Sequence, residues 1–145
     1  MKFNLARLNE TKTITNANEA FAGTALATEP FSIEIQKLQR TDQLNVTYDS
    51  TKPDGSFSNA LYSQNLFMLS LKSISGITNE AGESLELDAV YSIEDTEFTG
   101  REFLWNNFPN IVIKEITDTI RSFDEIEDKK KEELETVSDV TQIGA

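Results

Sequence analysis

The sequence contains no cysteine and no histidine. Without cysteine the chain has no disulfide and no thiolate nucleophile, and without histidine it has no side chain whose ordinary pKa lies near neutrality. Zinc sites that need sulfur or imidazole ligands are excluded for the same reason. The sequence therefore predicts no catalytic residue, no metal ligand and no cofactor-binding residue, and we expect a protein that is not an enzyme.

Basic residues are also scarce, with 13 Lys and Arg against 25 Asp and Glu, a formal net charge of −12 and a pI near 4.4. Binding to nucleic acid needs clustered cations that neutralise phosphates, so we expect no nucleic-acid partner. No apolar run in the sequence approaches the ~20 residues that span a bilayer. No membrane association is expected, and the N-terminus lacks the apolar block of a secretory signal, which favours a cytoplasmic protein.

A chain of 145 residues is long enough for one domain. Residues 1–30 are rich in Thr, Asn and Ala without sustained periodicity, and they are interpreted as an arm or a loosely packed lead-in. Residues 31–123 are expected to form a single α+β domain. Residues 124–145 are expected to form a charged helical extension with a frayed tail, supported by pairs of opposite charge four residues apart.

The first half of this domain is expected to be a β-hairpin. Apolar and polar residues alternate over 31–36 and again over 44–48, as in half-buried strands. The run from residue 49 to 56 contains Pro53, Asp54 and Gly55, a strong turn signal, and is expected to separate the β part from a helical part.

Helical spacing over 57–74 predicts a helix that is capped by Ser56 or Ser58 and ends at Gly76. Residues 77–91 are expected to form a short strand or an ordered loop.

The clearest local signal is a capping box, Thr99 followed three residues later by Glu102, flanked by Phe98 and Phe103 at the positions of a hydrophobic staple. A helix is therefore expected from Thr99, and Pro109 must interrupt it because proline has no backbone N–H. A second helix is expected from Pro109 to about residue 136.

Apolar side chains near these two helices are the candidate partner-binding residues. Aromatic residues anchor many protein interfaces, although at helical spacing they also pack in cores. The candidates are Trp105, Phe108, Ile113, Ile116, Ile120 and Phe123.

The order of these elements resembles that of tail assembly chaperones and small baseplate-assembly proteins of tailed bacteriophages. The resemblance lies in the strand IEIQKL, the helix ending LSLKSISGI, the turn TNEAGES and the run NNFPNIVIKEITDTI, within residues 31–123. It implies a binding role without catalysis, in a phage tail or baseplate assembly chaperone. Other phage or assembly proteins would be the partners.

Two alternatives stay open at this point. The first is a structural virion component whose N-terminal arm orders on a neighbour, found in the virion rather than in the host cytoplasm. The second is a carboxylate- or metal-dependent hydrolase, although no calcium-loop motif is present among the acidic residues. The sequence also leaves open a homo-oligomer.

Overall fold

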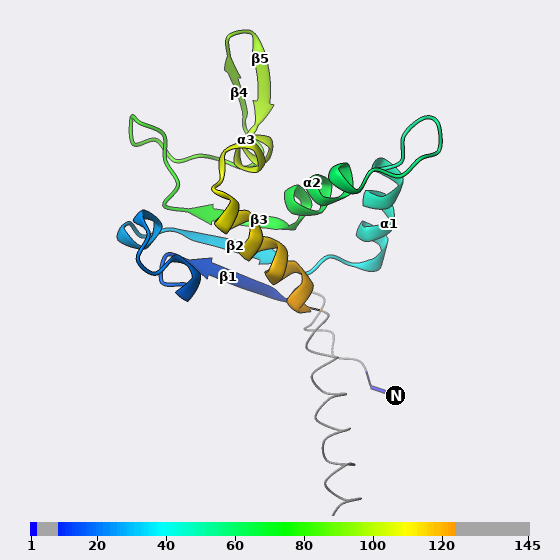
Figure 1. Ribbon diagram of the computed structural model, residues 1–145, viewed down its shortest axis with the longest axis horizontal. Coiled ribbons are helices and arrows are strands. Elements are labelled where there is room, and N and C mark those ends of the chain that lie inside the picture. The colour runs from blue at the N-terminus through cyan, green and yellow to red at the C-terminus, as the bar shows by residue number, and fades with distance from the viewer. Residues whose placement is uncertain (3–8, 124–145) are drawn as a thin grey trace, which may run out of the picture.

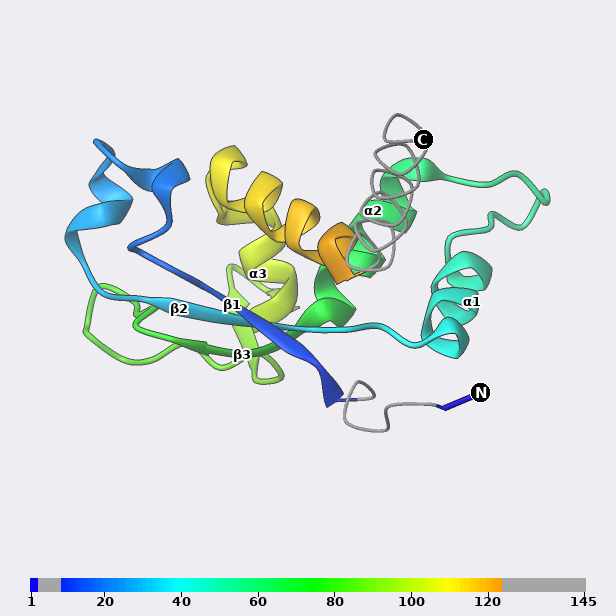
Figure 2. The same ribbon diagram turned by 90° about the horizontal axis from the view of Figure 1, so that it is seen from below.

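The computed structural model describes residues 1–2 and 9–123, and it shows an α+β fold, as the sequence predicts. Its main sheet has three antiparallel strands in the order β1, β2, β3 (Figure 1). These strands are β1 (Thr11–Thr15), β2 (Ser32–Gln36) and β3 (Leu71–Ser75). A helix over residues 110–123, drawn in yellow and orange, crosses one face of the sheet (Figures 1 and 2).

The interpretation of residues 1–30 as a loosely packed lead-in is wrong for residues 9–30, while residues 3–8 lie outside the described part. β1 pairs with β2 along its whole length, with Ile14 opposite Ile33. The chain then forms two 3-10 helices, η2 (Glu19–Phe21) and η3 (Ala25–Thr28), and Phe21 is fully buried. Two apolar side chains, Ile14 and Phe21, fix this segment on the core, although too few apolar residues surround them to produce a visible periodicity.

The strand predicted over 31–36 is confirmed as β2, but its expected hairpin partner is a helix, α1 (Arg40–Asp49). The Asp42 carboxylate accepts a hydrogen bond from the Gln39 backbone N–H at 2.9 Å, a contact typical of a helix start. Only Val46 is buried in α1, whereas Leu44 and Tyr48 are 65% and 81% exposed. Because Leu44 and Tyr48 stay in water and only Val46 is buried, their alternate spacing does not require a strand.

The turn after α1 is confirmed. The Gly55 N–H donates to the Lys52 carbonyl oxygen at 2.9 Å, and Gly55 has a φ of 87°, which glycine adopts readily. The loop joins two helices, however, and does not separate a β part from an α part. Ser58 caps the second helix, α2 (Asn59–Ser70), by accepting from the Leu61 N–H at 3.2 Å.

The helix predicted over 57–74 stops at Ser70, because residues 71–75 leave it to pair with β2 as β3. Gly76 follows with a φ of 76°, and a Cβ there would collide with the Pro30 carbonyl oxygen. The loop that comes next leads to a projecting hairpin of β4 (Val90–Ile93) and β5 (Thr96–Thr99) (Figure 1).

The capping box is confirmed at the start of α3 (Gly100–Asn107). Thr99 Oγ1 accepts from the Glu102 N–H at 3.2 Å, and Glu102 Oε1 accepts from the Thr99 N–H at 3.4 Å. The Phe98 and Phe103 rings stack with centroids 5.8 Å apart, as the staple predicts. α3 ends before Pro109, and the second helix is present over 110–123; its expected continuation to residue 136 lies outside the described residues.

The core joins the sheet to the helices that cover it. Its buried apolar side chains come from both ends of the described chain, so residues 11–123 share one hydrophobic core. They are Ile14, Phe21, Ile33, Ile35, Phe67, Leu71, Leu87, Leu104, Val112, Ile116 and Phe123.

Candidate functional site

An open groove of about 320 Å³ lies where the segment after β2 meets α1, α2 and the helix over 110–123. Its described lining residues combine apolar, hydroxyl or amide, and cationic side chains. They are Lys37, Leu38, Gln43, Tyr62, Ser63, Leu66, Thr117, Ile120, Arg121 and Phe123.

The groove carries a local charge opposite to that of the protein as a whole. No described lining residue is acidic, whereas Lys37 and Arg121 are both cationic, in a chain of net charge −12. Lys37 is half-buried and Arg121 is exposed, and neither forms an ion pair with a described residue. Two cations that pair with no acid of the described residues lie beside apolar side chains, and they form a surface that suits an acidic ligand with apolar groups.

Buried Ser50 ties together the two helices that form one side of the groove. Its hydroxyl donates to the Val46 carbonyl oxygen at 2.6 Å and accepts from Asn65 Nδ2 at 3.3 Å. Its own carbonyl oxygen accepts from the Ser58 N–H at 3.0 Å. A single residue therefore links the end of α1 to the start and middle of α2, which holds the relative position of these two helices.

The opposite side of the groove is fixed to the sheet by Lys12. Its ammonium group donates to the Ser122 hydroxyl at 2.6 Å and lies 5.0 Å from the centre of the Phe123 ring. Phe123 is 3% exposed and belongs to the core while also lining the groove. Ser122 and Phe123, the last described residues of this helix, are therefore held at the site.

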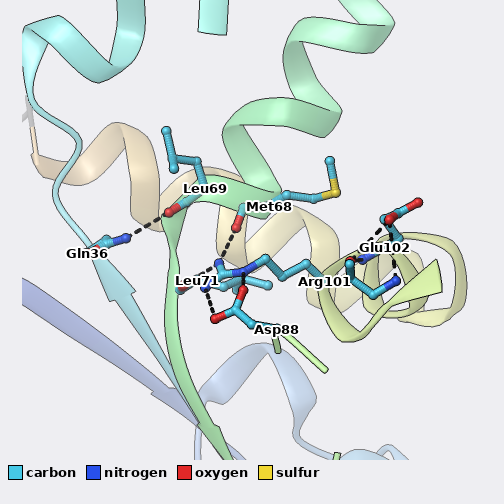
Figure 3. A network of polar contacts seen from close by, with 8 residues as sticks. Gln36, Met68, Leu69, Leu71, Asp88, Arg101 and Glu102 are labelled. Atoms are coloured by element: carbon cyan, nitrogen blue, oxygen red, sulfur yellow. Dashed lines mark hydrogen bonds and ion pairs between the residues drawn. The ribbon is translucent and has the colours of Figure 1, made fainter. Parts of the chain in front are cut away.

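Arg101 anchors the carboxyl end of α2, which carries three groove residues along its length (Figure 3). Arg101 Nη1 donates to the carbonyl oxygens of Met68 and Leu71, each at 2.6 Å. The last carbonyls of a helix have no partner within it, and a cation there also complements the negative end of the helix dipole. α2 has no basic residue in its own last turn, and Arg101 of α3 supplies this cation.

The same guanidinium holds Asp88. Arg101 Nε donates to Asp88 Oδ1 at 2.8 Å and Nη2 donates to Oδ2 at 3.4 Å (Figure 3). The hydrogen bond from Arg101, with the attraction of its charge, lowers the pKa of the Asp88 carboxyl below 3.8. Asp88 is exposed and Arg101 is mostly buried, so this contact places a loop against α3 and has no buried carboxylate that could serve as an acid or a base.

The structure divides the predicted partner-binding residues. Ile116 and Phe123 are buried in the core, so the expectation that their helix face forms a contact surface is wrong for these two residues, apart from the part of Phe123 that lines the groove. Ile113 is partly buried against the core, and Ile120 lies at the groove. The physical reason is that the helix over 110–123 packs against the sheet with the same apolar face that is predicted to contact a partner.

The two aromatic candidates pack inward as well. The Trp105 and Phe108 rings lie 5.2 Å and 6.3 Å from the Phe67 ring, which is fully buried in α2. These ring contacts therefore pack α3, and Phe108 directly after it, against α2.

Sequence reasoning missed the polar and cationic half of the groove. Lys37 and Arg121 belong to distant parts of the chain, and Tyr62 lies between them in the sequence. The only signal in the sequence that could have identified Lys37 and Arg121 is that they are cations in a strongly acidic chain.

Within residues 1–2 and 9–123, no group of three or more Asp or Glu side chains is arranged to hold a metal ion. The same part of the chain contains no helix long and apolar enough to cross a membrane.

Comparison of the chain with protein families, with curated proteins and with solved structures gives no match in any of the three.

Proposed function

We propose that this chain is a non-catalytic protein-interaction component that acts in the assembly of a larger particle, as an assembly chaperone of a phage tail or baseplate. The observation that carries the proposal is the groove at Lys37 and Arg121, an apolar and cationic surface on an acidic protein. A surface of this kind offers apolar area that a partner can bury together with charge complementarity, and both contribute to specific protein recognition. The element order that resembles phage assembly proteins supports the choice of particle.

The structural virion component is a weaker candidate. It depends on residues 1–30 forming an arm that orders on a neighbour. In the structure, β1 and Phe21 already belong to the chain's own sheet and core. No such arm is present within residues 9–30.

Removal of the coding sequence from its native genome tests the proposal. We expect particle assembly to fail, with tail or baseplate intermediates accumulating, and electron microscopy of the lysate measures this. Quantitative mass spectrometry of purified particles then separates the two roles, because a chaperone is absent from them and a structural component is present at fixed copy number. Normal particles from the deletion strain would contradict the proposal.

A further inference from the structure

We propose that the groove binds residues 124–145 of a second copy of this chain, so that two copies exchange these segments. The inference rests on the proposed function, since it names the partner of the same groove. A segment that binds this groove needs negative charge, apolar side chains, and a point of attachment to the chain that lies close to a groove.

The charge of the segment matches the groove. Residues 124–145 contain eight acidic and three basic side chains, and four of the acids fall within residues 124–128. The groove carries the cations Lys37 and Arg121, which attract these acids, and it has no acidic residue among its described lining residues. Opposite charges at an interface speed association and fix its register.

The segment also has apolar side chains for the apolar part of the groove. Ile126 and Leu134 are its best candidates, since each is surrounded by acidic residues. The groove provides Leu66 and Ile120 beside the two cations. An acidic peptide with spaced apolar residues is the chemistry that this surface recognises.

Connectivity favours exchange between two copies. Phe123 lines the groove, and residue 124 follows it directly, so the segment starts at the edge of its own groove. To lie back in that groove the chain would have to reverse its direction soon after Phe123, and residues 124–143 contain neither glycine nor proline, the residues that most often follow the end of a helix, which disfavours such a reversal. Exchange of an identical segment between two copies is a low-cost route to a two-fold dimer, and it lets each segment bind the other groove without that reversal.

Sedimentation equilibrium of the full chain tests the inference. We expect a monomer–dimer equilibrium whose dissociation constant rises with salt, because exposed charge pairs are screened. Lys37→Glu combined with Arg121→Glu should raise that constant at least about tenfold. The matched control, Lys52→Glu with Lys114→Glu, makes the same change in net charge at exposed cations outside the groove and should leave the constant unchanged.

A charge swap makes the test specific. Glu125→Lys, Glu127→Lys and Asp128→Lys in the wild-type background should also weaken the dimer, and adding them to the groove-reversed chain should restore it. Circular dichroism melts of every variant establish that each one folds.

Three results would overturn the inference: a monomer at every concentration, a dimer indifferent to reversal of the groove charges, or no restoration by the charge swap. Self-association of the isolated chain is measured independently of particle formation. A monomer that still serves particle assembly overturns the exchange alone, whereas a dimer that particle assembly does not need overturns the proposed function.

Discussion

Arg101 donates a 2.6 Å hydrogen bond from Nη1 to the carbonyl oxygen of Leu71, the residue at which α2 becomes β3. This contact joins the amino end of one helix to the point where another helix turns into a strand. Because α2 carries three residues of the groove, the position of the groove depends on a contact made outside it.

Arg101→Met should destabilise the protein by about 1–3 kcal/mol, because it leaves two carbonyl oxygens without their donor and removes the bond to Asp88. Chemical denaturation measures the free energy of unfolding. The control is Lys72→Met, which breaks an exposed 3.5 Å ion pair with Glu34 and should cost less than about 1 kcal/mol. Equal losses in the two variants would show that Arg101 contributes no more than a surface charge.

Thr99→Ala should lower the free energy of unfolding by about 0.5–2 kcal/mol, because its hydroxyl accepts the Glu102 N–H at the start of α3. Thr41→Ala removes a hydroxyl from an exposed residue of α1 and should change stability by less than about 0.5 kcal/mol. A Thr99→Ala variant as stable as the parent would mean that the cap does not contribute to stability.

Asp95→Gly should stabilise the protein by about 1 kcal/mol, because Asp95 has a φ of 64° in the turn between β4 and β5, where a Cβ is unfavourable. Glu97→Gly is the paired variant, at an exposed position inside β5, and should destabilise by about 0.5–1 kcal/mol. Thermal melts compare the two. Destabilisation by both substitutions would show that the turn carries no backbone strain.

Asp88 should titrate below its ordinary pKa of 3.8 in an NMR titration of its side-chain carboxyl, because Arg101 stabilises the charged form. A lowered folded-state pKa adds stability above the unfolded pKa, and that stability is lost as the pH falls through the folded pKa. In Arg101→Met, the pKa of Asp88 should return toward 3.8. Asp54 is the internal control, since its pKa is lowered by Ser56 and should not change.

The local parts of the fold could be predicted from the sequence, and the non-local parts could not. The capping box of Thr99 and Glu102 involves residues three apart, so its spacing alone identifies it. β3 continues the helical spacing of α2 and becomes a strand only because β2 is available to pair with it. No local pattern carries that information.

α1 illustrates a second limit. Leu44, Val46 and Tyr48 alternate as in a strand, but two of the three are exposed, and the pattern of burial that would identify the helix is visible only in the folded chain. The groove is the extreme case, because Lys37 and Arg121 line one groove only in the folded chain. The helix over 110–123, which carries Arg121, packs across the sheet there (Figure 2).

We propose that the groove is the surface through which this chain acts in particle assembly. The most direct test of this claim is the yield of complete particles when the deletion strain is complemented with the Lys37→Glu, Arg121→Glu variant. We predict that few complete particles form, while the Lys52→Glu, Lys114→Glu control restores the wild-type yield. A wild-type yield from the groove variant, expressed and folded at the level of the control, would contradict the claim.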